Sequence, residues 1–376
     1  MHGNATVRNV HPDESQIETT PAKTDVCNLQ SLLLAEKRCH RRVGYKNSTS
    51  RYHMNKLEKT YKLHKELMAE TYKTQKGDEF DIYEPKHRVV TSTKFKDRIP
   101  QASFSVNYLY EKLIPKLFDN NFACIKGKGV DNARNAFMEI LRNTDINGYC
   151  LKADLKGYFD SIPHDKLIAE LSEYITDDWA LKYYTDVINC NGKDVGIGLG
   201  SEINQLSAVA YLNKLDHELD DGNYIRYMDD FAYIGTKERC ECVLGIIRKE
   251  CDRLGVRLSE KKTYIQPVTN PIKFLGFAFL KHKTGKITVK KQKDKLNNEK
   301  RKLRRMKKSN RIAFDDILNH YQCVRATMKK GSRSGAVKLD KYFNELFKEE
   351  LKNADKKEQS DGKNEQRQHE SSENVA

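Results

Sequence analysis

The 376-residue sequence predicts an α+β fold in which short strands are separated by helices. The strand prediction rests on segments such as 224–234, where apolar residues alternate along a short run. The helix prediction rests on longer stretches such as 202–219 and 237–254, whose apolar residues recur at helical spacing. A chain of this length has room for roughly two to three domains.

The first third of the chain is predicted to be mainly helical. Residues 1–28 are polar and lack periodicity, so we expect a mobile arm, followed over 29–79 by an extension whose helical pattern continues to about Tyr72. Residues 80–93 predict two short strands. Asp97 is the expected N-cap of the next helix, which carries three leucines on one side: Leu109, Leu113 and Leu117.

The rest of the chain alternates strands and helices up to residue 280 and then becomes strongly basic. Lys and Arg dominate residues 281–311, and further helices are expected to about residue 351. Residues 353–376 have almost no apolar side chains, which predicts a disordered tail. The predicted strands lie at 149–155, 224–234, 256–266 and 272–280, and the predicted helices at 131–142, in two stretches before residue 190, at 202–219 and at 237–254.

The composition favours a polyanionic partner. The chain has 68 Lys and Arg against 53 Asp and Glu, a net charge of +15. Cationic side chains that neutralise phosphates release condensed counterions, so nucleic acid is the first candidate. A basic tail that serves only solubility is the alternative.

Neither a membrane span nor a disulfide framework is expected. No run approaches the roughly 18 apolar residues that a span requires, and no segment is typical of a signal peptide, so we expect a cytoplasmic protein without membrane association. The nine cysteines include no CxxC pair, and Cys240 and Cys242 form only a CxC. Reduced structural thiols are favoured over a zinc site.

Residues 224–234, YIRYMDDFAYI, place Asp229 and Asp230 side by side between apolar runs. Paired aspartates at a hairpin turn have a structural explanation, because Asp readily bonds its own backbone there. However, the apolar flanks would bury this hairpin while its tip stays charged. Two adjacent carboxylates repel each other unless a cation lies between them, so we expect a divalent metal ion.

The chemistry that needs such a site is in-line attack on a phosphate. Two metal ions activate the attacking hydroxyl and stabilise the leaving oxygen, and hard oxygen ligands suit Mg²⁺. A further carboxylate from a neighbouring strand is required, and Asp154 ends the predicted strand at 149–155.

Several motifs resemble those of reverse transcriptases. KADLKGYFDSIPHDKL at 152–167 resembles motif A of that family, and YMDD at 227–230 resembles motif C. The resemblance runs from about residue 80 to 350 and is to bacterial enzymes related to those of group II introns, retrons and diversity-generating retroelements. Further motifs follow in the family's order: KHRVV with KFKDRIPQ in the fingers, NNFACIKGKGVDNA before the palm, GIGLGSEINQ for motif B, LSEKKT for motif D and FLGF for the primer grip.

The resemblance implies a right-hand polymerase fold with fingers, a palm of antiparallel sheet packed on helices, and a helical thumb. The implied divisions are fingers at 80–148, palm at 149–282 with fingers elements near 163–200, a basic thumb at 283–352 and a disordered tail at 353–376.

The resemblance also assigns the metal ligands. Asp154 and Asp229 are expected to hold two Mg²⁺ ions, with Mn²⁺ as the alternative metal. Asp230 is expected to support the site electrostatically and to contact the metal less directly. The backbone carbonyl of Leu155 is a further expected ligand.

Other residues are assigned to the nucleotide. Phe159 matches the family's aromatic steric gate, which excludes the 2′-hydroxyl and so selects deoxynucleotides; an ordinary core Phe is the alternative. The triphosphate requires cations, for which Lys86 and Arg88 lead, followed by Lys94 and Arg98. Lys262 matches the motif D lysine that protonates pyrophosphate, with a plain surface lysine as the alternative.

Motif B and the primer grip complete the set. Many reverse transcriptases have Pro-Gln-Gly in motif B, whereas this chain has Leu199 before Gly200, so the glutamine contact is in doubt there. Gly200 and Gln205, in the following helix, remain candidates near the nucleotide or template. The primer grip comprises Phe274, Leu275, Gly276 and Phe277, for which a buried strand is a compatible explanation.

The sequence thus predicts an RNA-directed DNA polymerase whose partners are an RNA template or noncoding RNA, an RNA/DNA duplex and deoxynucleoside triphosphates. A homo-oligomer or an accessory protein is left open. A polymerase-like RNA-binding scaffold is opposed by the intact aspartates, and an RNA-templated RNA polymerase by Phe159. The role is expected in phage defence or in a retroelement with a dedicated noncoding RNA, with a diversity-generating element as the alternative.

Overall fold

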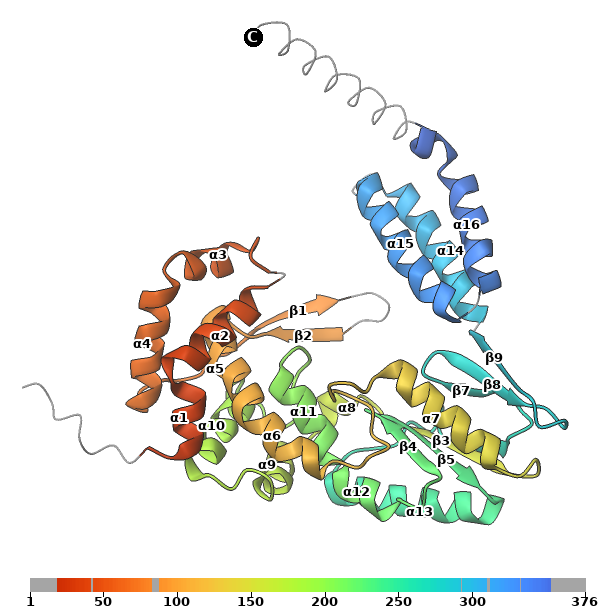
Figure 1. The fold of residues 1–376 in the computed structure, drawn as a ribbon, viewed down its shortest axis with the longest axis horizontal. Helices are drawn as coiled ribbons and strands as arrows, with labels where there is room; N and C mark the ends of the chain where they lie inside the picture. The colour runs from red at the N-terminus through yellow and green to blue at the C-terminus, as the bar shows by residue number, and fades with distance from the viewer. Residues whose placement is uncertain are drawn as a thin grey trace, which may run out of the picture. The chain divides into compact units, whose positions relative to one another are not determined.

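The computed structural model describes residues 19–41, 43–82, 88–291, 293–309, 312–331 and 333–352. The chain divides into two compact units, one of Met1–Ile140 with Gly148–Gln266 and the other of Leu141–Asn147 with Pro267–Ala376. Both units contain helices and antiparallel strands, which confirms the predicted α+β class (Figure 1). The predicted tail at 353–376 lies outside the described residues.

The described part of the first unit begins with four helices, and residues 1–18 of the predicted arm lie outside the described residues. The four helices are α1 (Pro21–Cys27), α2 (Leu29–His40), α3 (Asn47–Met54) and α4 (Lys56–Met68). The arm predicted over 1–28 is wrong for its last residues, because Val26 and Cys27 of α1 are fully buried and Lys23 forms an ion pair with Glu70 at 2.9 Å. The polar composition of this segment concealed its few buried side chains.

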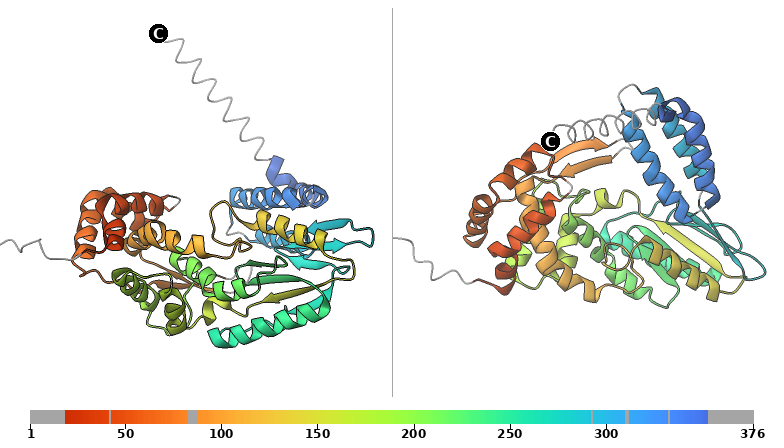
Figure 2. Two further views of the ribbon diagram at one scale, coloured as in Figure 1. Left: turned by 60° about the horizontal axis from the view of Figure 1, so that its bottom comes forward. Right: turned by 45° about the horizontal axis from the view of Figure 1, so that its top comes forward.

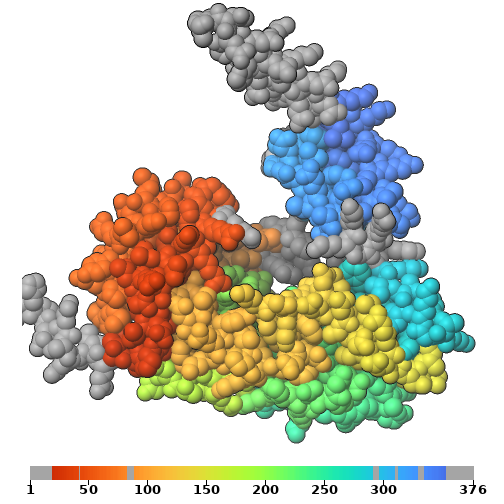
Figure 3. Space-filling view, viewed as in Figure 1, coloured from red at the N-terminus to blue at the C-terminus, as the bar shows by residue number. Residues whose placement is uncertain are grey.

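These helices pack directly against the segment that follows them. In Figure 1, α2 lies beside α5 (Phe95–Phe104), and α1 contacts α4, α5 and α10. In the space-filling view, the red and orange residues of α1–α4 and the gold residues after α5 form one continuous surface (Figure 3). The N-terminal helices therefore share the hydrophobic core of the first unit.

A hairpin and an irregular helical stretch come next. The two strands predicted at 80–93 are confirmed as the antiparallel pair β1 (Asp78–Ile82) and β2 (Arg88–Ser92). The N-cap prediction for Asp97 is wrong: Lys94 is the N-cap residue, and the buried Asp97 accepts hydrogen bonds from Tyr72 Oη at 2.5 Å and the Gln75 amide at 3.2 Å. Beyond α5 lie a π-helical turn (Ser105–Leu109), α6 (Tyr110–Leu113) and a 3₁₀ turn (Ile114–Lys116).

The centre of the first unit is a four-stranded sheet in the order β4-β5-β3-β6. Helix α13 lies along one face of this sheet, in contact with β3 and β5 (Figure 2). The strands are β3 (Tyr149–Asp154), β4 (Tyr224–Tyr227), β5 (Asp230–Gly235) and β6 (Tyr264–Pro267), and the helices are α7 (Val130–Asn143), α8 (Tyr158–Ser161), α9 (His164–Ser172), α10 (Asp178–Asn189), α11 (Glu202–Tyr211), α12 (Asn213–Glu218) and α13 (Lys237–Leu254).

Two predictions for this region need correction. The helix predicted over 202–219 is interrupted at Leu212, which separates α11 from α12. The strand predicted over 256–266 forms only as β6, although Leu258 makes an isolated bridge with Leu155.

The second unit has its own sheet and its own core. Its strands are β7 (Ile272–Phe274), β8 (Phe277–Lys281) and β9 (Ile287–Lys291), and its helices are α14 (Lys293–Lys308), α15 (Phe314–Gly331) and α16 (Arg333–Leu346). Leu303, Ile317, Leu339, Phe343 and Phe347 are buried together between the helices. The basic composition after residue 281 gave no indication of β9.

None of the described helices is long and apolar enough to cross a lipid bilayer.

A pair of leucines in α2 tests whether the N-terminal helices belong to the core. Leu32 is fully buried, whereas Leu34 is 62% exposed on the same helix. Leu32→Ala is expected to lower the unfolding free energy by about 2–5 kcal/mol, because it leaves a cavity in the core. Leu34→Ala, the matched control, should change it by less than about 0.5 kcal/mol. Urea unfolding followed by circular dichroism measures both, and equal effects would contradict a shared core.

Candidate active site

The central sheet brings three aspartates from two distant segments together. The β3–β5 register places Asp154 directly opposite Asp230, and Tyr227 pairs with Asp230 across the β4–β5 turn. Met228 and Asp229 form that turn, and the Leu155 amide donates a hydrogen bond to the Asp229 carbonyl at 3.3 Å. Backbone pairing alone therefore fixes the three residues as neighbours.

The turn depends on an unusual backbone conformation. Met228 has φ +57°, in the left-handed region that residues other than Gly seldom adopt. Such conformations persist where the surrounding structure holds them. Here the Met228 carbonyl accepts a hydrogen bond at 3.0 Å from the guanidinium of Arg226.

Arg226 is fully buried beneath this turn. Its guanidinium pairs with the equally buried Asp216 of α12, with Nε–Oδ1 at 2.6 Å, and donates to the Val209 carbonyl of α11 at 2.8 Å. Tyr224 Oη donates to the same carboxylate at 2.9 Å. Hydrogen bonds from the arginine thus connect the turn to both α11 and α12.

Of the three aspartates at the centre of the sheet, Asp154 and Asp230 each have a lysine partner. Lys262 Nζ lies 2.6 Å from Asp154 Oδ1, and the lysine side chain is 53% exposed. The buried Lys152 donates to Asp230 Oδ1 and, at 2.8 Å, to the Phe231 carbonyl. Among the described residues, no three His, Cys, Asp or Glu side chains are gathered as a ready metal site. A divalent ion at these carboxylates would have to compete with the two ammonium groups.

The electrostatics nevertheless fit a cation. Burial raises the pKa of Asp229, the charges of Asp154 and Asp230 raise it further, and Lys262 opposes the effect. Burial and the neighbouring carboxylates thus disfavour the ionised form of Asp229, and a bound cation would stabilise that form. The donor set consists of hard carboxylate oxygens, which suit a divalent metal ion.

The segments on either side of this centre are hydrogen-bonded to each other. The Phe159 carbonyl in α8 accepts from the Ile197 amide at 3.0 Å, and the side-chain amide of Asn204 donates to the Ile197 carbonyl. Gly198 has φ +68°, and a Cβ there would lie 3.2 Å from Thr91 Oγ1 of β2. The glycine-rich segment therefore lies between Phe159 and the β1–β2 hairpin.

A family profile described as "Reverse transcriptase (RNA-dependent DNA polymerase)" matches residues 74–279, more than half of the chain. The chain belongs to the reverse transcriptase family. Family membership makes the observed α+β architecture a right-hand polymerase fold. A comparison with curated proteins finds no match.

Solved structures similar to this chain include three structures of telomerase. Apo telomerase from Candida tropicalis is 11% identical over 58% of this chain and 49% of its own, with a TM-score of 0.45. A form of it truncated from the C-terminal domain is 13% identical over 57% and 55%, with a TM-score of 0.44. Candida albicans telomerase with the TWJ fragment of telomeric RNA is 11% identical over 72% and 56%, with a TM-score of 0.43. The chain spans about half the length of these relatives.

The predicted nucleotide-binding residues have different environments. Lys94 forms an ion pair with Asp78 at 2.5 Å, and Arg98 donates to Ser92 Oγ and the Thr93 carbonyl, both at 2.9 Å. Arg88 begins β2, and Lys86 lies outside the described residues. Of the two cations whose side chains the structure describes, Lys94 pairs with β1 and Arg98 binds the end of β2 and the residue after it.

The remaining predicted residues lie in loops and helices around the sheet or in the second unit. Gly200 has φ +115°, and Gln205 in α11 accepts a hydrogen bond from Cys124 Sγ at 3.8 Å. In the second unit, Leu275 and Gly276 form the β7–β8 turn with positive φ, while Phe274 and Phe277 are buried. The conformation of that turn is the reason for glycine in the FLGF motif.

Sequence reasoning missed Arg226, Asp216 and Lys152. The signal for Arg226 was present, because a charged residue stands alone within the apolar run before YMDD. Asp216 likewise is a charged residue near the end of the apolar stretch predicted as a helix over 202–219. Nothing in the sequence showed that these two charges, ten residues apart, meet in the core.

Arg226 is predicted to position the catalytic turn. Arg226→Met should cost about 3–5 kcal/mol of stability, because it leaves Asp216 charged and unpaired in the core. Adding Asp216→Asn removes that charge and should restore much of the stability. Activity should stay low in the double variant, because Met228 still lacks its donor. Thermal unfolding and kcat separate the two effects, and recovery of both together would refute a positioning role.

The charge of Asp229 is predicted to destabilise the metal-free protein. A carboxyl whose pKa is raised on folding lowers the unfolding free energy above that pKa, and the cost disappears as the pH falls through it. In EDTA at pH 7, Asp229→Asn should therefore raise Tm by roughly 2 °C. The difference from wild type should shrink towards pH 4. Calorimetry measures both, with the exposed Asp220→Asn as control, and a lower Tm for Asp229→Asn would contradict the prediction.

Proposed function

We propose that the protein is an RNA-directed DNA polymerase that adds deoxynucleotides to a 3′ end on an RNA template. The observation that carries this proposal is the register that sets Asp154 against Asp230 with Asp229 in the adjoining turn. Membership of the reverse transcriptase family supports the same reaction. The substrates are deoxynucleoside triphosphates, and the partners are an RNA template or noncoding RNA and the RNA/DNA duplex.

Asp154 and Asp229, with the Leu155 carbonyl, are the proposed ligands of two Mg²⁺ or Mn²⁺ ions. Such ions activate the attacking hydroxyl and stabilise the leaving oxygen. Asp230 acts as an auxiliary charge, since Lys152 already engages its carboxylate. Lys262 reaches Asp154 on an exposed side chain and is the proposed proton donor to the departing pyrophosphate.

The domain roles follow from the family's fold as proposals. The fingers comprise residues 80–148 and elements near 163–200, the palm 149–282, and the thumb 283–352. Phe159 is proposed to select deoxynucleotides, and Gly200 and Gln205 to lie near the nucleotide or template. Lys86, Arg88, Lys94 and Arg98 are proposed to contact the triphosphate, and Phe274 to Phe277 the primer end.

The biological setting belongs to the same proposal. We place the protein in the cytoplasm of a bacterial phage-defence system or retroelement with a dedicated noncoding RNA. All nine cysteines are free thiols, which fits a reducing compartment. The alternative of a diversity-generating-retroelement polymerase shares the same chemistry.

One observation favours a second candidate, a polymerase-like RNA-binding scaffold with weak or template-independent transfer. Asp154 and Asp230 each form an ion pair with a lysine, as carboxylates with a purely structural role would. Activity decides between the two candidates.

Primer extension with deoxynucleotides on an RNA template tests the polymerase. Wild type should extend the primer only with divalent metal present. Asp229→Asn should reduce the rate at least roughly 10²-fold, because a charge that stabilises the transition state is lost. Asp230→Asn should cost only about tenfold, as expected of a supporting group. Equal extension by wild type and Asp229→Asn would exclude this assignment.

Phe159 provides an independent test of substrate choice. Replacing its ring with a small side chain should open space for the 2′-hydroxyl. Phe159→Ala is therefore expected to increase incorporation of ribonucleotides relative to deoxynucleotides by about tenfold, close to the value of one lost contact. Single-nucleotide kcat/KM values measure the ratio, with Phe122→Ala as a control aromatic. An unchanged ratio would make Phe159 an ordinary core residue.

A further inference from the structure

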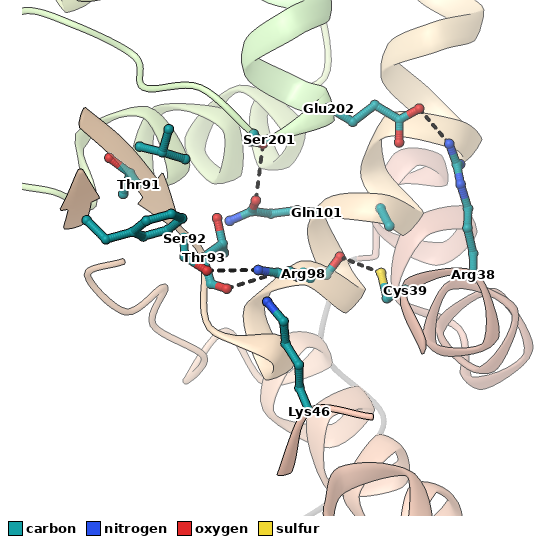
Figure 4. A pocket seen from close by; sticks show the side chains of 14 residues that line it. Arg38, Cys39, Lys46, Thr91, Ser92, Thr93, Arg98, Gln101, Ser201 and Glu202 are labelled. Carbon is teal, nitrogen blue, oxygen red and sulfur yellow. Dashed lines mark hydrogen bonds and ion pairs between the residues drawn. The ribbon is translucent and has the colours of Figure 1, made fainter. Parts of the chain in front are cut away.

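A pocket of about 660 Å³ opens in the first unit at the C-terminal end of α13. Its walls come from the last turns of α13, the loop 256–261 that follows this helix, and the residue after Leu155. None of the described residues assigned above to metal, nucleotide or primer lines this α13 pocket. By contrast, the pocket of about 350 Å³ in Figure 4 is lined by Arg98 and Gly200, which already belong to the proposed nucleotide site.

The α13 pocket carries an excess of positive charge. Its lining includes four cationic side chains and two carboxylates. Arg248 lies 3.7 Å from Glu260, so these two charges offset each other. Three further exposed cations have no hydrogen-bond or ionic partner for their side chains within the described part of the chain: Lys156, Arg257 and Lys261. They are available to an anionic ligand, with only Asp252 opposing them.

The shape of the α13 pocket favours a small ligand over a nucleic-acid strand. Its cations line one hollow whose wall includes the buried Cys251 and Val256, and its volume lies in the range of small-molecule sites. A strand would need a positive groove that follows its backbone. Along α13 itself the other arginines are already paired, Arg239 with Asp221 at 3.4 Å and Arg253 with Glu250 at 2.6 Å.

The lining groups suit a chain of phosphates. Lys and Arg side chains bind phosphate oxygens through charge-assisted hydrogen bonds. The half-buried Ser259 lines the same wall and adds a hydroxyl donor. A diphosphate or triphosphate group presents several charged oxygens over a short length, so that one ligand can bind three cations at once.

The wall of the α13 pocket is hydrogen-bonded to the end of the catalytic strand. The Lys156 amide donates to the Arg257 carbonyl at 2.8 Å. The Ser259 amide donates to the Asp154 carbonyl at 2.7 Å, and the Ser259 carbonyl accepts from the Lys262 amide at 2.9 Å. The Lys262 ammonium group in turn lies 2.6 Å from Asp154 Oδ1. A ligand in the pocket therefore contacts the loop that positions Lys262.

We propose that the α13 pocket binds the phosphate chain of inorganic pyrophosphate or of a free nucleoside triphosphate and, when occupied, restrains the loop 256–262. Lys156, Arg257 and Lys261 bind the phosphate oxygens. The site is separate from the place where a nucleotide reacts. Its effect on catalysis rests on the proposed function, because Lys262 acts as a proton donor only if the chain transfers nucleotides.

Calorimetric titration of the full chain in metal-free buffer tests the site without catalysis. Inorganic pyrophosphate and ATP are the two probes. Tighter binding of ATP would identify a nucleotide as the source of the phosphate chain, and equal or tighter binding of pyrophosphate would identify pyrophosphate. Lys156→Gln and Arg257→Gln should each weaken binding of the tighter probe about tenfold, as expected for one charge-assisted hydrogen bond.

Hydrogen exchange tests the restraint of the loop. Amides in residues 256–262 should exchange more slowly in wild type when the tighter probe is bound, because a restrained loop opens less often. The same probe concentration should give less protection in Arg257→Gln. Unchanged exchange in wild type saturated with the probe would overturn the proposal.

Three lysine variants outside the α13 pocket serve as controls. Lys249→Gln removes an exposed lysine from α13, Lys46→Gln removes one from the pocket in Figure 4, and Lys262→Gln removes the partner of Asp154. All three should bind the probes as wild type does, and unchanged melting curves exclude misfolding. The proposal is overturned if any of them weakens binding as much as Arg257→Gln does, or if single-stranded RNA binds and neither probe does.

The outcome is separable from the proposed function. Calorimetry and hydrogen exchange need no primer and no metal ion. If wild type extends no primer but Arg257→Gln loses affinity for the probe, the polymerase assignment fails and the pocket stands. If wild type extends primers but binds neither probe outside the active site, the pocket assignment fails alone.

Discussion

The buried ion pair between Arg226 and Asp216 is the interaction on which the candidate active site depends. Burying two charges is costly, and good geometry with additional hydrogen bonds is needed to offset that cost. Here the guanidinium also donates hydrogen bonds to the carbonyls of Met228 and Val209, and the Tyr224 hydroxyl donates one to the Asp216 carboxylate. The main contribution of the pair is therefore to the geometry of the turn rather than to stability. Apolar packing alone would provide no hydrogen-bond donor for the Met228 carbonyl in this strained turn.

The same argument explains how three carboxylates can lie together in a folded protein. Antiparallel pairing forces Asp154 and Asp230 to face each other whatever their charge. Lys152 and Lys262 then offset two of the charges, one from a buried position and one from the surface. Among the described residues no lysine or arginine forms an ion pair with Asp229, and burial together with the charges of Asp154 and Asp230 raises its pKa. The unfavourable electrostatic energy of the site is therefore largest at Asp229, the residue expected to bind metal.

The sequence was informative wherever a local pattern determined the structure. Alternating apolar residues predicted the strands that carry Asp154 and Asp230, and apolar residues at helical spacing predicted the helix at 237–254, which forms as α13. Prediction failed where distant contacts decide. Asp97 has the chemistry of an N-cap, but its buried carboxylate accepts hydrogen bonds from Tyr72 and the Gln75 amide instead. No spacing rule indicates which polar group a folded chain will pair internally.

The burial of α1 and α2 shows that the hydrophobic core begins earlier in the chain than the match to the family profile. The residues that a family shares begin at 74, but the hydrophobic core that supports them begins with Val26 and Leu32. The family profile marks the residues whose sequence is shared with relatives, whereas folding requires the apolar faces of the core helices and strands to be buried. A fragment cut at the edge of the shared region would expose the apolar faces of α5 and α10. In this chain the hydrophobic core therefore extends beyond the residues that match the family profile, and the N-terminal helices are part of that core.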